Sequence, residues 1–462
     1  MNTIDLLLLL GILATSLTLV IKPNMIENIF RPLLGLVLLL SIGQILLSGL
    51  YWQFLPAYLL LLLFLGKAFS FKHSTWINSG MVFKISLQFL SVALLLSWSV
   101  FLPVPKLTEP TGNFQVGTKI FRWFDPSRDE PLTADPLDRR NVVVQAWYPA
   151  DPDHQGNPSV YLDGLDHLPP MVSGLPSFLL NHFDQINTYA ILDSPVSKAK
   201  KKWPVILFLT GNGASRAFYT SLAIGLSSKG FVVLCLDHPY EAALTQLAGG
   251  KLATPIEVYH KDDPDLLQFM EVRLQTRLAD VRFVLDQIGS EEEASNGFFS
   301  SLDQDLIGIT GHSLGGTTAA VAMAHDSRIK AAANIDGTLY GELPKPDGPR
   351  PFLLLESNKD DPDRYKRYEA GNRFFFRQFG GGYRFEIAEA DHYSFTDAPL
   401  FLAFPSRILA GRIFGIGDIP RRTHLATVDF LQTFFEGALN RKVPDLDLIA
   451  SRRQGIIRKM ID

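Results

Sequence analysis

The first hundred residues constrain this chain more than any other part of it, because they are almost entirely apolar. Three apolar runs contain 18 residues each: residues 4–21, 33–50 and 85–102. A helix needs about 20 apolar residues to cross the roughly 30 Å hydrocarbon core of a bilayer. A fourth run, residues 51–71, contains Lys67, whose long side chain can reach the membrane surface. The sequence therefore predicts four transmembrane helices.

Two other interpretations fit these runs less well. A secretory signal peptide begins with basic residues and ends at a small-residue cleavage site, whereas the only early charge here is Asp5. Core helices of a soluble protein would carry more charged residues than this segment does.

The basic residues of the predicted loops indicate the orientation of the helices. Lys22, Arg31, Lys72 and Lys84 fall in the first and third loops, whereas the second loop has no charge. Loops with an excess of lysine and arginine remain in the cytoplasm. With four spans, everything after residue 102 then lies on the other side. We therefore expect an integral membrane protein with an extracytoplasmic second domain.

After residue 104 the chain reads as an α/β protein. Short apolar runs predict strands at residues 142–147, 205–209, 231–236, 306–310, 331–335, 352–355 and 383–387. Helical patterns lie between and after them, at residues 217–229, 266–287, 316–325, 365–378 and 422–439. Strands and helices in this order predict a mostly parallel sheet covered by helices on both faces.

This pattern divides the 462-residue chain into four parts. We expect a four-helix transmembrane region at residues 1–104, a linker at 105–113, the α/β domain at 114–440, and a surface helix or loose tail at 441–462.

Composition excludes several classes of function. A formal net charge of −4 gives no indication of nucleic-acid binding. The single cysteine, Cys235, excludes an internal disulfide and a cysteine-rich metal site, and its apolar surroundings predict a buried core residue. The acidic loop at residues 262–265 is interpreted as a solvated turn rather than a calcium site. No metal and no organic cofactor are expected.

Residues 311–315, Gly-His-Ser-Leu-Gly, indicate the chemistry. An apolar strand precedes this motif and a helix of small residues follows it, as a nucleophile elbow requires. Gly311 and Gly315 allow neighbouring backbone to approach where a β-carbon would clash. Ser313 is therefore the predicted nucleophile, at a helix N-terminus that favours developing negative charge.

A serine hydroxyl needs a base, which in turn needs an acid to orient it. In an α/β-hydrolase fold these partners follow the serine in the order acid, then histidine. His325 belongs to the helix that leaves the elbow, and His424 is expected to be a partially exposed residue of the last helix. His392 follows the strand at residues 383–387, at the sheet edge where this fold places its base. We therefore predict His392 as the base.

The residues alone leave two positions open for the acid. Asp336 directly follows the predicted strand after the nucleophile, whereas Asp360 and Asp361 follow the next strand in a loop that could equally be a solvated turn. Asp391 is adjacent to His392 and is not expected to orient its ring.

An oxyanion hole needs two backbone N–H groups that point at the developing charge. The residue after the nucleophile, Leu314, is expected to supply one of them. The loop after the strand at residues 205–209 contains Thr-Gly-Asn-Gly, and Asn212 is the second predicted donor.

Taken together, the motifs resemble the platelet-activating factor acetylhydrolase family, the secreted or type II group of α/β-hydrolases. The resemblance runs from about residue 115 to residue 437. The similar segments are residues 211–214, 225–233, 237–238, 277–280, 283–286, 311–316, 334–336 and 392–397. The chain looks like a bacterial-type member with added N-terminal transmembrane helices, which the animal enzymes lack.

The resemblance implies Ser313, Asp336 and His392 as the triad, because this family takes its acid directly after the strand that follows the nucleophile. It also implies calcium-independent hydrolysis of short or oxidised acyl groups from phospholipids. The chain differs from the animal enzymes at Thr210 and Asn212, where they have histidine and leucine. A polyester-degrading or general esterase, a transacylase and a catalytically silent membrane scaffold are the alternatives.

Overall fold

The computed structural model divides the chain into two compact units. One unit contains Met1–Pro105, Phe178–His182 and Phe401–Ser406, and the other contains the rest. The structure describes residues 3–18, 23–50, 52–69, 90, 104–165, 168–172, 175–180, 182–257, 264–290, 297–358, 362–403, 406–408, 411, 417 and 419–461.

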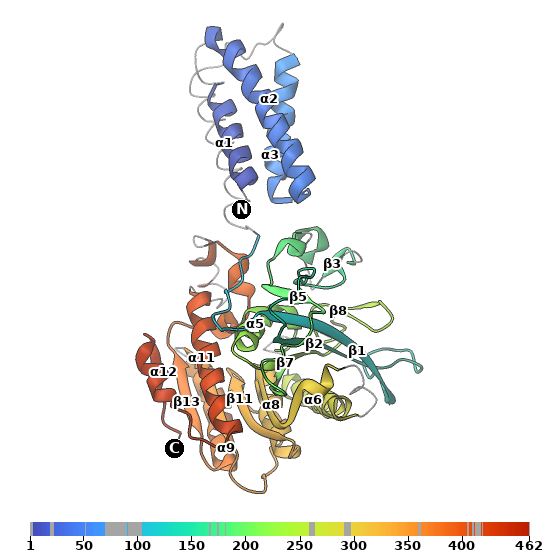
Figure 1. The fold of residues 1–462 in the computed structure, drawn as a ribbon, viewed down its shortest axis with the longest axis vertical. Coiled ribbons are helices and arrows are strands. Elements are labelled where there is room, and N and C mark those ends of the chain that lie inside the picture. The colour runs from blue at the N-terminus through green and yellow to red at the C-terminus, as the bar shows by residue number, and fades with distance from the viewer. Residues whose placement is uncertain are drawn as a thin grey trace. The chain divides into compact units, whose positions relative to one another are not determined.

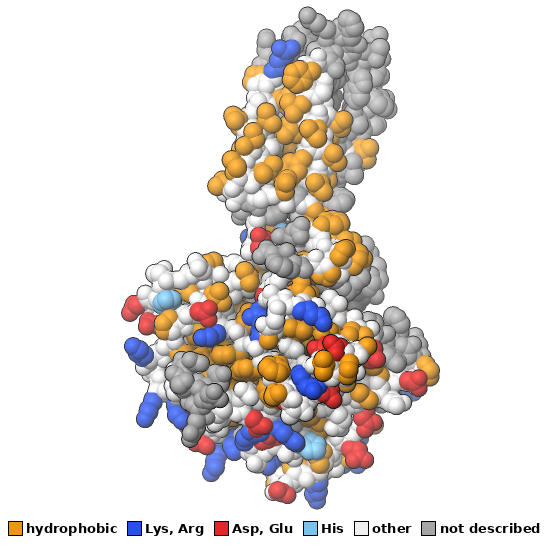
Figure 2. All heavy atoms as spheres, turned by 90° about the vertical axis from the view of Figure 1, so that its right-hand side faces the viewer, with side chains coloured by type: hydrophobic (Ala, Val, Ile, Leu, Met, Phe, Trp, Pro, Cys, Tyr) orange, Lys and Arg blue, Asp and Glu red, His pale blue; other side chains and the backbone are white. Residues whose placement is uncertain are grey.

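The first unit is helical. It contains α1 (Thr3–Thr18), α2 (Pro23–Ser48), the short 3-10 helix η1 (Trp52–Phe54) and α3 (Leu55–Phe69). Leu8, Val37 and Phe64 belong to the apolar core between these helices. Their outer surfaces are also apolar, since Leu46 is 80% exposed and Leu63 is 67% exposed, and Figure 2 shows hydrophobic side chains spread over this unit.

One described helix, Ile29–Leu47, is long and apolar enough to cross a membrane, while Thr3–Thr18 and Trp52–Gly66 are shorter apolar helices. The predicted span at residues 85–102 lies outside the described residues except for Leu90. The number of spans therefore stays a prediction.

The second unit is built on a ten-stranded sheet with the order β14-β13-β12-β11-β10-β6-β7-β2-β1-β5 (Figure 1). Its strands are β1 (Val116–Asp129), β2 (Arg139–Pro149), β5 (Ala190–Leu192), β6 (Trp203–Leu209), β7 (Val232–Asp237), β10 (Leu302–His312), β11 (Ile329–Ile335), β12 (Phe352–Ser357), β13 (Tyr383–Ile387) and β14 (Ile456–Arg458). Strands β6, β7 and β10 to β13 are parallel, as the sequence predicts. Two small hairpins, β3 (Met171–Val172) with β4 (Leu175–Pro176) and β8 (Thr245–Gln246) with β9 (Leu252–Ala253), lie outside this sheet.

Helices cover both faces of the sheet (Figure 1). One core joins the sheet to α6 (Leu266–Gly289), α8 (Leu314–His325) and α9 (Pro362–Phe379), and the other joins it to α5 (Thr220–Ser228), α11 (Pro420–Leu439) and α12 (Leu446–Arg452). Along β6 the side chains alternate between the two cores, because successive residues of a strand point to opposite faces. Leu207 belongs to the first core and Phe208 to the second.

The predicted central strands are all present, but sequence reasoning missed the strands at the sheet edges. The strand β1 contains charged residues and Pro126, so it lacks the apolar run that identifies a buried strand. In the segment predicted as a helix or loose tail, the structure has both α12 and β14, and β14 pairs antiparallel with β13. Cys235 is fully buried, as predicted.

Candidate active site

Ser313 lies in the turn between β10 and α8. Its backbone has φ 57° and ψ −124°, a conformation that residues with a β-carbon rarely adopt. Its amide donates to the Ile335 carbonyl at 2.8 Å. This geometry is the sharp strand-to-helix turn that the motif predicts.

The two motif glycines are required by the close packing of this turn. A β-carbon on Gly311 would lie 2.5 Å from the carbonyl carbon of Gly315, and one on Gly315 would lie 2.3 Å from the carbonyl oxygen of Leu209. Both contacts are with backbone, which cannot move aside as a side chain can.

His392 connects the serine to an acid. Its Nε2 lies 3.1 Å from Ser313 Oγ, and its Nδ1 lies 2.6 Å from Asp336 Oδ2. It is the first residue of the 3-10 helix η8 (His392–Phe395), which follows β13, and its side chain is about one-fifth exposed, at 20%. The structure therefore brings together the three residues that the sequence assigns to the triad.

Asp336 is held by the neighbouring strand. It is fully buried, and Ser357 at the end of β12 donates to it from its backbone amide at 2.9 Å and from its hydroxyl at 2.8 Å. These donors leave Oδ2 aimed at His392. The alternative acids, Asp360 and Asp361, lie outside the described residues. Asp391 caps η8 through a reciprocal pair of hydrogen bonds with Ser394.

The other two histidines after the serine are in different environments. His325 is exposed, on the helix that leaves the elbow. The expectation that His424 is partially exposed is wrong, because it is fully buried between the Thr108 hydroxyl at 2.9 Å and the Thr396 carbonyl at 2.9 Å. Burial lowers the pKa of His424 to about 4. Its neighbours come from distant segments, so its sequence position alone could not predict this burial.

The two predicted oxyanion donors, Leu314 and Asn212, lie in the segments that directly follow β10 and β6. Leu314 is the first residue of α8, so its amide has no partner inside the helix. Asn212 follows β6 in a tight turn in which the Ala214 amide donates to the Gly211 carbonyl at 3.2 Å. The side chain of Asn212 is exposed.

Several residues to which sequence reasoning gave no role contact this site. They are Tyr219, Arg277, His312 and Ser357. His312 lies inside the elbow motif and Arg277 begins the similar segment 277–280, so both were visible as motif members. The neighbouring sequence does not indicate that His312 and Arg277 contact the loops of the site, because these contacts join segments that are far apart in the sequence.

A buried group of charges fixes α6 against β2. Asp280 accepts from Arg140 Nη2 at 2.7 Å and contacts His238 Nδ1 at 2.8 Å, and all three side chains are nearly or fully buried. Burial alone would raise the pKa of the Asp280 carboxyl, but Arg140 and His238 outweigh it and hold that pKa well below its ordinary value. The ion pairs lock the helix that carries Arg277.

In the part of the chain that the structure describes, no group of three or more histidine, cysteine, aspartate or glutamate side chains could hold a metal ion. The acidic loop at residues 262–265 is only partly described.

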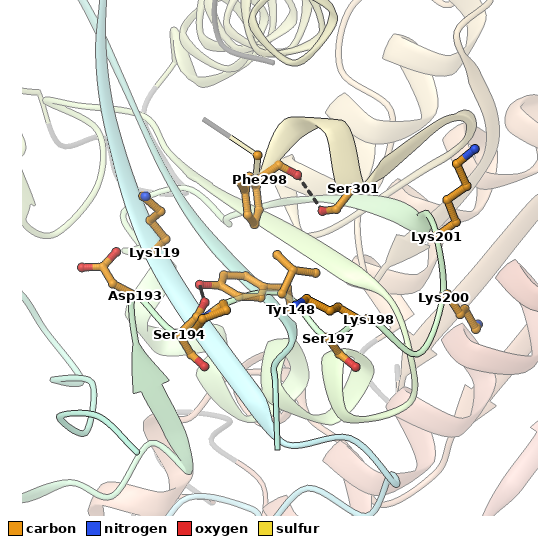
Figure 3. A pocket seen from close by; sticks show the side chains of 13 residues that line it. Lys119, Tyr148, Asp193, Ser194, Ser197, Lys198, Lys200, Lys201, Phe298 and Ser301 are labelled. Carbon is orange, nitrogen blue, oxygen red and sulfur yellow. Dashed lines mark hydrogen bonds between the residues drawn. The ribbon is translucent and has the colours of Figure 1, made fainter. Parts of the chain in front are cut away.

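A hollow of about 550 Å³, whose lining is drawn in Figure 3, lies near the start of β10. Its lining includes Lys119, Lys198, Tyr148 and Phe298. Phe298 lies just before β10, whereas Ser313 follows the end of that strand. The hollow is therefore separate from the candidate active site.

The second unit is also similar to known proteins. The family model described as "Platelet-activating factor acetylhydrolase, isoform II" matches residues 104–287. A "Probable 1-alkyl-2-acetylglycerophosphocholine esterase" of Arthroderma benhamiae is 25% identical over 367 residues, which cover 72% of this chain and 88% of the fungal protein.

Animal and bacterial proteins are also similar. The platelet-activating factor acetylhydrolase of Cavia porcellus is 24% identical over 242 residues, 47% of this chain and only 55% of the animal protein. The solved ferulic acid esterase from Streptomyces cinnamoneus has a TM-score of 0.63 and 26% identity, and the match covers 77% of this chain and 100% of the esterase chain. The second unit therefore has the α/β-hydrolase fold.

Proposed function

Because the chain belongs to the platelet-activating factor acetylhydrolase family and is an ester hydrolase, we propose that Ser313, His392 and Asp336 are its catalytic triad. The observation that carries the proposal is the continuous relay of 3.1 Å from Ser313 Oγ to His392 Nε2 and 2.6 Å from His392 Nδ1 to Asp336 Oδ2. Both distances are within hydrogen-bonding reach, as a base and its orienting acid require.

In the proposed acylation step, His392 Nε2 removes the proton of Ser313 as Oγ attacks the ester carbonyl carbon. Negative charge moves to the carbonyl oxygen, where the amides of Leu314 and Asn212 stabilise it. The C–O bond to the alcohol then breaks, and the imidazolium of His392 returns its proton to the leaving oxygen. Asp336 holds the neutral imidazole in the tautomer whose Nε2 can accept the proton, and it stabilises the imidazolium that forms.

Deacylation repeats the step with water as the nucleophile. His392 removes a proton from water, the hydroxyl oxygen attacks the acyl carbon, and Ser313 leaves with the proton from His392. The products are a carboxylic acid and the free enzyme. The chain's own residues and water handle every proton in this scheme.

The proposed substrates are short or modified acyl esters of phospholipids, or similar lipophilic esters. The names of the fungal and animal relatives support a phospholipid, and the name of the structural relative supports a broader range of carboxylic esters. The apolar helices of the first unit support integration into a membrane. The basic residues of the predicted loops support a hydrolase domain outside the cytoplasm.

The test combines a variant with a panel of substrates. Ser313→Ala should fold normally and lose at least about a thousandfold in ester turnover, because the attacking atom is gone. The panel compares p-nitrophenyl esters of increasing acyl length with phosphatidylcholines that carry either an acetyl or a long acyl chain at sn-2. A preference for the sn-2 acetyl lipid supports the proposed substrate, whereas full activity of Ser313→Ala would overturn the triad.

A further inference from the structure

A buried chain of hydrogen bonds joins the loop after β6 to the loop after β13. The Gly211 amide donates to the Tyr219 hydroxyl at 2.9 Å, and this hydroxyl lies 2.9 Å from His312 Nδ1. His312 Nε2 lies 2.8 Å from the backbone carbonyl of His392. Tyr219 is fully buried and His312 is 2% exposed, so water cannot readily replace these partners.

The types of donor and acceptor in these three hydrogen bonds determine which atom donates in each of them. A carbonyl oxygen can only accept, so His312 Nε2 carries the proton that is donated to His392. In the neutral ring, Nδ1 must then accept, and it accepts from the Tyr219 hydroxyl. The hydroxyl is left free to accept from the Gly211 amide. With a neutral His312 ring, these groups are satisfied when the Gly211 amide, the Tyr219 hydroxyl and His312 Nε2 each donate one hydrogen bond.

Gly211 belongs to the loop that carries the proposed oxyanion donor. The Thr210 carbonyl and the Gly211 amide are parts of one planar peptide unit. Arg277 Nη1 donates to that carbonyl at 2.6 Å, while Tyr219 accepts from the amide on the other side. The two contacts hold this peptide from both ends, one unit before the peptide that carries the Asn212 amide.

The next peptide unit is held at its carbonyl. The Gly211 oxygen accepts from the Ala214 amide at 3.2 Å and from Arg277 Nη2 at 3.4 Å. The C=O and N–H of a trans peptide point in opposite directions. The Asn212 amide is therefore directed away from Ala214 and Arg277.

We propose that Tyr219 and His312 are positioning residues that hold the oxyanion loop and the His392 backbone in register with Ser313. His312 precedes the serine in the chain, and its ring lies 4.6 Å from the His392 ring between centroids. One side chain thus links the nucleophile turn to both other loops. The inference rests on the proposed triad and adds residues that do not touch the substrate.

Tyr219→Phe is the direct test, since it removes the hydroxyl and keeps the ring that packs on Phe208 at 5.0 Å. The Gly211 amide and His312 Nδ1 lose their partner, and the Thr210–Gly211 peptide loses one of its two contacts. We expect kcat to fall about 10- to 100-fold with KM changed less than about threefold, since the missing support acts on the transition state. The affinity for a trifluoromethyl ketone, which forms a tetrahedral adduct with the serine, should fall in parallel.

Tyr148→Phe is the matched control. Tyr148 also has a buried hydroxyl bonded to backbone, the Ser194 carbonyl at 2.7 Å, and it lines the hollow of Figure 3 rather than the candidate active site. Both variants should lose similar thermal stability, and only Tyr219→Phe should lose kcat. If the two variants have the same kcat and the same ketone affinity as wild type, the inference is wrong.

The His312 variants give a second readout. His312→Gln keeps an N–H near the position of Nε2, whereas His312→Phe keeps only the ring shape. Gln should restore part of the kcat that Phe loses, and equal kcat values would contradict a positioning role. Fluorophosphonate labelling separates this inference from the proposed function, because Ser313→Ala should remain unlabelled while Tyr219→Phe should be labelled slowly.

Discussion

Asp336 is the residue whose chemistry can be tested most sharply. Its carboxylate accepts from His392 Nδ1 and from both donors of Ser357. Asp336→Asn places an amide beside His392 that can hold the imidazole in the wrong tautomer. In a serine-protease precedent this change costs roughly 10⁴ in turnover. We expect a loss of that order in kcat for ester hydrolysis, with the fold retained.

Asp360→Asn and Asp361→Asn are the controls for this prediction. Each should stay within about tenfold of wild type, because the sequence, with a proline beside Asp361, predicts a solvated turn that contributes little to the transition state. A severe loss at Asp361 would leave the fold and the nucleophile in place and would show that the acid is misassigned.

Asp397 makes stability depend on pH. It is fully buried, and its Oδ1 has no hydrogen-bond partner among the described residues. Burial raises the pKa of this carboxyl from 3.8 to about 7. The folded protein therefore keeps the proton between about pH 4 and pH 7 while the unfolded chain releases it, so stability falls as pH rises through this window. Above it the loss is complete.

Asp397→Asn should remove this dependence, because an amide does not ionise. Relative to wild type, the variant should gain stability from pH 4 to pH 8 by at most about 4 kcal/mol. Thermal unfolding of the full-length proteins in detergent at several pH values measures the difference. A wild-type and a variant curve that run parallel across this range would contradict the prediction.

Among the structural elements, the turn between β10 and α8 tolerates the least change. Gly315→Ala would place a methyl group 2.3 Å from the Leu209 carbonyl oxygen, so β6 and α8 would have to separate. We expect a loss of several kcal/mol in stability, since backbone must move to accept the methyl group. Expression level and thermal unfolding in detergent report this loss.

Gly249→Ala is the matched control for the turn. A β-carbon there would meet no atom within 4 Å. Its melting temperature should stay within a few degrees of wild type. If Gly315→Ala and Gly249→Ala have the same melting temperature, the close backbone contact at Gly315 does not determine the stability of the turn.

For the whole molecule, the orientation of the chain in the membrane is the main prediction. A reporter that is active only outside the cytoplasm should be on when fused at the C-terminus and off when inserted in the loop at residues 71–81. The basic residues of the predicted loops give this result if there are four spans. The C-terminus is preferred over a site in α11, because α11, α12 and β14 are packed against the sheet.

The opposite reporter pattern would mean an odd number of spans or a wrong assignment of the basic loops. Fusions to Ser313→Ala should behave like wild type, since topology does not depend on turnover.

The sequence by itself determined the parts of this protein whose signals are local. The elbow motif with its strand and helix, the central parallel strands and the apolar helices all follow from short-range periodicity and the needs of individual residues. Ser313 and His392 were identifiable because each follows a clear strand. The structure brings Ser313 Oγ to 3.1 Å from His392 Nε2.

Only the tertiary structure decided which distant groups meet. It joins Asp336 to His392 and Ser357, buries His424, adds β14 to the sheet edge and connects Gly211 to His392 through Tyr219 and His312. Hydrogen bonds of this kind depend on the direction of one side chain relative to a backbone group many residues away. Periodicity does not encode that direction, because it arises only when the sheet brings the ends of its strands together.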